Sequence, residues 1–170
     1  MMGRVAAVAL VALCFAEQTA ADSLYTSIQR SDCRPPSPSV AQPFTDKDLG
    51  VQECPAPDGW RLLFVASQAN SWLEVHGPGV RWSGERDVVY ESPIGLSPNV
   101  GGTLVEWRCD PARRLRAIIF RVVAQDRSDP TRPVSRLFVV RLGPGAPCLI
   151  GRVVSNAAAR ALADRPSACP

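Results

Sequence analysis

Two apolar runs in the second half of the chain give the clearest structural signal. Residues 115–124 (LRAIIFRVVA) and 134–142 (VSRLFVVRL) are rich in β-branched and aromatic residues and are apolar on both alternating faces at their centres. That pattern is typical of strands covered on both sides. The intervening segment 125–133 is polar, contains two prolines and is too short for a crossover helix. We therefore predict two central antiparallel strands joined by an exposed loop.

Shorter apolar runs predict further strands around this hairpin. Residues 92–102 have the composition of a loop, and an alanine-rich helix capped by Asn156 is expected over 157–163, before Pro166. The sequence thus predicts a mainly β fold, an antiparallel β-sandwich or small barrel with a short C-terminal α-helix. The additional strand candidates are residues 60–66, 71–76 and 148–154, with weaker ones at 80–82 and 87–90.

The N-terminal segment has the profile of a secretory signal peptide. One positive charge, Arg4, precedes an uninterrupted apolar run at 5–16 that would rise only roughly 18 Å as a helix, which is short of a bilayer's hydrocarbon layer. A small-residue pattern predicts cleavage after Ala21. We therefore expect a periplasmic or secreted protein without a membrane span. Residues 22–51 are interpreted as a proline-rich extended arm, and 52–170 as a single β-rich domain with the C-terminal helix.

Five cysteines follow the predicted cleavage site, and an oxidising compartment favours pairing most of them. Cys33 and Cys54 bracket a proline-rich stretch that cannot fold by burial alone, so they form the first predicted disulfide. Cys148 and Cys169 flank the last strand and helix and form the second, with Cys148–Cys109 as the rival pairing. Cys109 is then the candidate free thiol. No cysteine spacing fits a zinc site or a redox pair.

Candidate binding residues come from one strand and one loop. In the strand at 71–76, Trp72, Glu74 and His76 share one face, opposite Leu73 and Val75, and we expect that face to be exposed. Arg127 and Arg132 lie in the polar loop 125–133 and are candidate exposed binding residues as well.

Charge and motif content restrict the function classes. The net charge of +3 is spread along the chain without a basic stripe, which argues against nucleic-acid binding. His76 is the one histidine, and no serine lies in a nucleophile-elbow motif. We predict no metal, no cofactor and no catalytic residues.

Several of these features together resemble a family of small secreted bacterial proteins of unknown function. The likeness is carried by the signal peptide, by Asp32-Cys33 and Cys54, by Glu106-Trp107-Arg108, by the run at 117–123, and by the strand around Cys148 with its alanine-rich helix. The resemblance implies no activity. Cys109, directly after Glu-Trp-Arg, departs from that pattern.

The favoured functional hypothesis is an exported, non-enzymatic binding or envelope-accessory protein that presents loops 92–102 and 125–133 to an envelope protein or a glycan. A lysozyme-inhibitor-like protein is one alternative, by analogy of size and compartment. A small hydrolase or thiol enzyme that uses Cys109, or a serine, with His76 is another.

Overall fold

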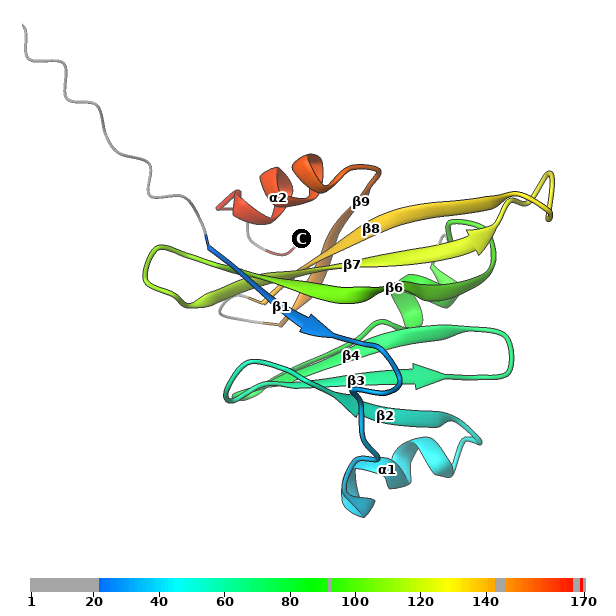
Figure 1. Ribbon diagram of the computed structural model, residues 1–170, viewed down its shortest axis with the longest axis horizontal. Helices are drawn as coiled ribbons and strands as arrows, with labels where there is room; N and C mark the ends of the chain where they lie inside the picture. Colours follow the sequence, from blue (N-terminus) through cyan, green and yellow to red (C-terminus); the bar gives the residue numbers. More distant parts are fainter. Residues whose placement is uncertain (1–21, 92, 143–145, 167–168, 170) are drawn as a thin grey trace, which may run out of the picture.

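The fold is a sandwich of two antiparallel β-sheets with a short C-terminal helix, as predicted (Figure 1). This computed structural model describes residues 22–91, 93–142, 146–166 and 169. The expected leader, residues 1–21, lies outside the described residues. Within the described part of the chain, no helix is long and apolar enough to cross a membrane.

The larger sheet has five strands in the order β1-β6-β7-β8-β9, and each neighbouring pair is antiparallel. β7 and β8 have a partner on each side, which confirms that the two apolar runs form a central antiparallel hairpin. The strands of this sheet are β1 (Ser23–Ser27), β6 (Leu96–Cys109), β7 (Leu115–Gln125), β8 (Pro133–Arg141) and β9 (Cys148–Val153).

The smaller sheet is a meander of four consecutive strands in the order β2-β3-β4-β5. Its third turn, between β4 and β5, contains Gly79 at a φ of +71°, a conformation that glycine adopts without strain. The strands are β2 (Gly50–Cys54), β3 (Arg61–Ala66), β4 (Ser71–Gly77) and β5 (Val80–Ser83).

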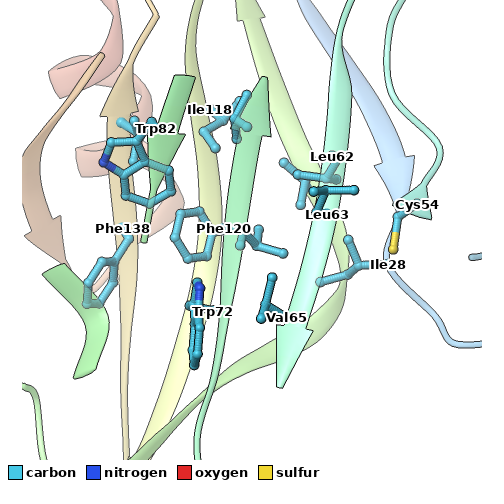
Figure 2. Packing of buried hydrophobic residues seen from close by; sticks show 14 of the residues in the cluster. Ile28, Cys54, Leu62, Leu63, Val65, Trp72, Trp82, Ile118, Phe120 and Phe138 are labelled. Carbon is cyan, nitrogen blue, oxygen red and sulfur yellow. The ribbon is translucent and has the colours of Figure 1, made fainter. Parts of the chain in front are cut away.

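One hydrophobic core lies between the two sheets (Figure 2). Trp82 of β5 packs against Phe120 of β7 with ring centroids 6.0 Å apart, and Phe120 packs against Phe138 of β8 at 5.7 Å. Such tilted aromatic pairs add about 0.5–1.5 kcal/mol beyond the area they bury. The register of the central hairpin, with Phe120 opposite Phe138, therefore brings the largest side chains to the middle of the sandwich.

The C-terminal helix α2 (Asn156–Asp164) covers the other face of the larger sheet. Ala159 and Ala163 of α2 pack on the outward residues Ile119 and Val139, which alternate with inward residues of the core. This second covering layer explains why the two central strands are apolar on both faces. The helix begins one residue earlier than expected, and its cap is Ser155, whose hydroxyl accepts a hydrogen bond from the Ala158 amide, rather than Asn156.

Residues 22–51 do not form an extended arm, and this prediction is wrong. The segment supplies β1, the helix α1 (Pro38–Thr45) and the start of β2. Proline at the first helical position suits a helix start, and Phe44 at the other end of α1 is buried in the core cluster. An isolated bridge between Arg34 and Glu53 and the adjacent disulfide then tie the segment to the smaller sheet.

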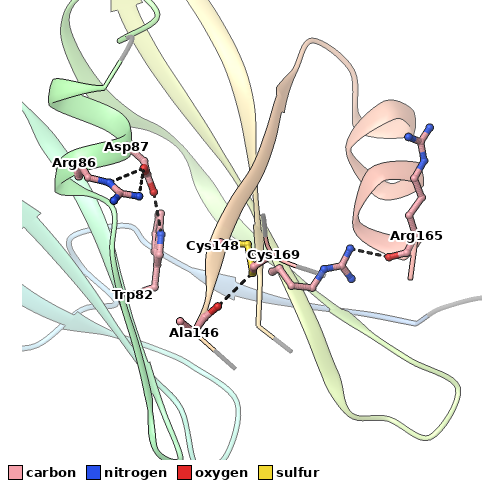
Figure 3. The surroundings of a disulfide bond; sticks show 8 residues. Trp82, Arg86, Asp87, Ala146, Cys148, Arg165 and Cys169 are labelled. Carbon is pink, nitrogen blue, oxygen red and sulfur yellow. Dashed lines mark hydrogen bonds and ion pairs between the residues drawn. A yellow bond between two sulfur atoms is a disulfide. The ribbon is translucent and has the colours of Figure 1, made fainter. Parts of the chain in front are cut away.

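Two other local predictions are also wrong. From Leu96 onward the predicted loop 92–102 is part of β6, which accommodates Pro98 and two glycines through register shifts. Residues 87–90 fall in the single-turn π-helix η1 (Arg86–Tyr90) instead of a strand. In η1 the carboxylate of Asp87 accepts a hydrogen bond of 3.1 Å from the indole nitrogen of Trp82, which fixes the turn against the core (Figure 3).

Candidate functional site

The strand face predicted to bind a partner is buried. The register of β3 with β4 places Trp72, Glu74 and His76 on one face, as expected from their alternation. However, Trp72 is only 2% exposed and belongs to the core cluster, and Glu74 is 5% exposed. The prediction that this face is exposed is therefore wrong for Trp72 and Glu74, while His76 is half-buried.

Glu74 is a structural carboxylate with a full set of donors. Ser83 donates to Oε1 at 3.0 Å, while Arg81 donates to Oε2 at 3.1 Å and the His76 ring nitrogen lies 3.0 Å from the same oxygen. Burial opposes ionisation, but these hydrogen bonds outweigh it and hold the pKa of Glu74 below its usual value. A carboxylate of this kind stays ionised and links β4 to β5, so it is unsuited to general acid catalysis.

Both predicted disulfides are present. Cys33 is bonded to Cys54, and Cys148 is bonded to Cys169, each across a sequence separation of 21 residues. Figure 3 shows the second bond beside Ala146 and the end of α2. These two bonds indicate an oxidising environment.

Cys109 is a free thiol buried in the larger sheet. Burial, together with the negative charges of Asp22 and Asp110, raises the pKa of Cys109. Its side chain is 3% exposed, and no hydrogen bond in the described part of the chain joins it to His76, which lies in the other sheet. A neutral, covered thiol without a base lacks the activation that a nucleophile needs.

Arg127 and Arg132 are exposed in the turn that connects β7 to β8. The amide of Asp126 donates to the carbonyl oxygen of Arg132 at 2.9 Å, and Ser128 donates to the Asp126 carboxylate, so the loop is a closed polar turn. Arg127 and Arg132 are therefore exposed on this turn, as predicted.

A large cleft lies at the opposite end of the β7–β8 hairpin, where the sequence predicted no site. It has a volume of about 970 Å³ and is open to solvent on one side. Its walls combine apolar side chains with three arginines and one aspartate. The lining residues are Trp60, Pro78, Val80, Asp110, Pro111, Arg114, Leu115, Arg116, Arg141, Leu142, Ala146, Pro166 and Cys169.

Trp60 forms the aromatic wall of this cleft. It precedes β3 and stacks edge-on against the fully buried Trp107, with ring centroids 6.2 Å apart. Gly77 allows this position, because a Cβ there would come within 2.5 Å of the Trp60 ring. Trp107 is itself fixed by a hydrogen bond of 2.8 Å from its indole nitrogen to Thr26. Trp60 is therefore held in place while one part of its ring stays accessible.

A β-bulge places Arg116 in the cleft. Along β6 and β7, Arg108 pairs with Ala117 and the next residue, Cys109, pairs with Leu115, so Arg116 is the extra residue of the bulge. Bulges redirect side chains relative to the regular alternation. Here the result is a half-buried arginine beside the apolar side chain of Leu115.

The other two arginines of the cleft have structural partners. Arg141 is 5% exposed and donates to the carbonyl oxygens of Ala163 and Arg165 at 3.1 and 2.7 Å, which caps the end of α2. Arg114 donates to the Asp110 carboxylate at 2.8 Å through Nε, with Nη2 at 2.7 Å from the same oxygen. These contacts hold both side chains in the wall of the cleft.

A second, smaller cleft of about 250 Å³ lies beside α2, and its charged side chains Glu106, Arg121 and Arg160 each have a hydrogen-bond partner. Arg160 donates to Glu106 at 2.8 Å and to the hydroxyl of Tyr25 at 2.9 Å, and Ser23 also donates to Glu106. Arg108 completes the network through Asp164 of α2. This network therefore anchors α2 to the larger sheet, and its polar groups are bonded to one another.

The cleft residues were missed because they come from separate parts of the sequence and form no motif. Only the excess of arginine in apolar surroundings near 114–116 and 141 could have suggested them. Among the residues that the structure describes, no group of three or more potential ligands is placed to hold a metal ion. Comparison with known proteins finds no matching family model, no matching curated protein and no matching solved structure.

Proposed function

We propose that this protein is exported, with its leader removed after Ala21, and acts as a non-enzymatic binding protein that holds a small ligand in the large cleft. One observation carries the proposal: an accessible tryptophan ring, Trp60, faces a concave apolar site that also contains the half-buried Arg116. Concave, mainly apolar sites with a few polar groups are the usual form of ligand pockets.

The cysteine chemistry agrees with this proposal. Two disulfides suit an oxidising compartment outside the cytoplasm. The remaining thiol, Cys109, is buried with a raised pKa and lies in the other sheet from His76, the one histidine of the chain, which favours binding over a thiol-enzyme mechanism.

Native mass spectrometry of the protein incubated with a small-molecule extract of the envelope tests the proposal. We expect one or more ligand-bound species. Pro111→Trp places a large ring on the exposed rim of the cleft and should abolish them, whereas Pro130→Trp, at the exposed tip of the β7–β8 loop, should leave them unchanged. Equal binding by both variants, or no bound species with the unaltered protein, would contradict the proposal.

A further inference from the structure

The large cleft carries an excess of positive charge. Three arginines and one aspartate line it, and the aspartate, Asp110, is already paired with Arg114. Arg141 is committed to the carbonyl groups at the end of α2. Arg116 differs from both, because its side chain has no hydrogen bond or ion pair within the part of the chain that the structure describes.

Arg116 and Arg141 also lie close enough to repel each other. Burial and the positive charge of Arg116 lower the pKa of Arg141. Asp164 offsets part of this effect, and Arg141 is already bonded to carbonyl oxygens, so Arg116 is the cation of the cleft that an anionic ligand would meet. The polar half of the cleft is therefore complementary to negative charge.

The other half of the cleft is suited to hydrocarbon. Leu115 and Val80 line it and are half-buried, and Leu142 lies at its base with 4% of its surface exposed. Trp60 adds a flat aromatic wall. A ligand that fills this site must therefore join an apolar body to an anionic end.

We propose, on the basis of the binding function above, that the ligand is an amphipathic anion with an apolar chain and a single carboxylate or phosphate head. The head group pairs with Arg116, whose planar guanidinium fits either oxyanion in a bidentate manner. The chain lies against Trp60 and Leu115. Arg116 is then the residue that selects anionic over neutral amphiphiles.

Titration with simple amphiphiles tests this assignment, with intrinsic tryptophan fluorescence as the signal. Trp60 lines the cleft, whereas Trp72, Trp82 and Trp107 are at most 5% exposed. The probes are dodecanoate, dodecyl phosphate and neutral dodecanol, each below its micelle concentration. We expect both anions to bind at least about tenfold more tightly than dodecanol, since a charge-assisted hydrogen bond contributes on that scale.

Two arginine variants give the matched control. Arg116→Gln should weaken binding of both anions at least about tenfold more than it weakens binding of dodecanol, while Arg127→Gln, on the exposed loop, should change neither. Circular dichroism of both variants checks that they fold alike. Preference for dodecanoate over dodecyl phosphate, or the reverse, identifies the head group.

Dodecanol binding as tight as dodecanoate, or an unaltered affinity in Arg116→Gln, would overturn the anion assignment while leaving a binding cleft in place. Failure of all three probes, together with a cleft-dependent species in the mass-spectrometry experiment, would overturn the amphiphile class but not the proposed function. The two proposals can therefore fail separately.

Discussion

The two ends of the β7–β8 hairpin carry arginines in opposite settings. At the loop end, Arg127 and Arg132 are exposed on a polar turn. At the other end, roughly 30 Å away by the rise of an extended strand, Arg116 is half-buried and Arg141 is buried against the carbonyl groups at the end of α2. An exposed arginine has little effect on the free energy of folding. A desolvated arginine lowers stability unless hydrogen bonds or an opposite charge offset the loss of its hydration. The arginines at the cleft end therefore carry a desolvation cost that those at the loop end do not.

Removal of a disulfide should have the largest effect, and only one of the two disulfides should matter for ligand binding in the cleft. Both bonds span 21 residues, so replacing either pair with serine should cost about 3 kcal/mol of unfolding free energy on the loop-entropy model. Cys169 lines the cleft, so the Cys148→Ser/Cys169→Ser variant should also lose ligand binding. Urea unfolding and fluorescence titration measure both effects. Retained ligand binding in that variant, or loss of ligand binding in Cys33→Ser/Cys54→Ser, would contradict a specific role of the cleft end in binding.

Arg141→Met should have the next largest effect. The change leaves the carbonyl groups of Ala163 and Arg165 without their charged donor, at a cost of about 2 kcal/mol. Arg127→Met at the loop end is the matched control and should stay within about 0.5 kcal/mol of the unaltered protein. Equal stability of the two variants in urea unfolding would show that burial does not distinguish the two ends.

Gly77→Ala should disturb the cleft through Trp60. The added methyl group would overlap the indole ring, so the ring must shift, at a cost of about 1 kcal/mol or more. We expect a change in tryptophan emission and weaker ligand binding. Gly50→Ala is the control, since its nearest neighbour would lie at an ordinary contact distance of 3.7 Å. Unchanged emission in Gly77→Ala would mean that Trp60 is not held in this position.

The smallest expected effect is the loss of folding stability at low pH. Both ends of the β7–β8 hairpin contribute to it in the same direction. Hydrogen bonds from the backbone and side chain of Arg114 lower the pKa of Asp110, and those from Ser128 lower the pKa of Asp126. A carboxyl whose folded-state pKa is depressed stabilises the fold above its unfolded pKa, here 3.8, and loses that contribution as the pH falls through its folded-state pKa. Thermal unfolding midpoints should therefore decline below about pH 3.8.

Asp110→Asn and Asp126→Asn should each reduce that decline slightly. Only Asp110→Asn removes a negative charge from the cleft, so it alone should tighten binding of an anionic ligand. A steeper decline in either variant would contradict the assigned direction of the pKa shifts.

Local patterns in the sequence predicted much of the fold. Apolar runs of strand length predicted β3, β7, β8 and β9, alternation predicted β4, and a weaker signal predicted β5. The prolines between Cys33 and Cys54 indicated a disulfide. Periodicity states which residues share a face but not what covers that face. For this reason it placed Trp72 and Glu74 together correctly and still gave them the wrong exposure.

The cleft could not be predicted in the same way. Trp60 and Leu142 line one cleft only because the two sheets pack against each other, and Arg116 lines it because a bulge changes the alternation of β7. The helix α1 was not predicted because prolines usually indicate irregular structure, and α1 contains Pro43 in its interior. These features depend on tertiary packing, which a single sequence does not reveal.

The most direct test of the account is to find which tryptophan responds to a ligand. The four indole ¹⁵N–¹H signals can be followed by nuclear magnetic resonance while the envelope extract is added, with Trp60→Phe to assign the cleft signal. We predict that the Trp60 signal shifts while those of Trp72 and Trp82, which do not line the cleft, stay in place. Shifts of amide signals from the loop around Arg127, with the Trp60 signal unchanged, would contradict the cleft as the binding site.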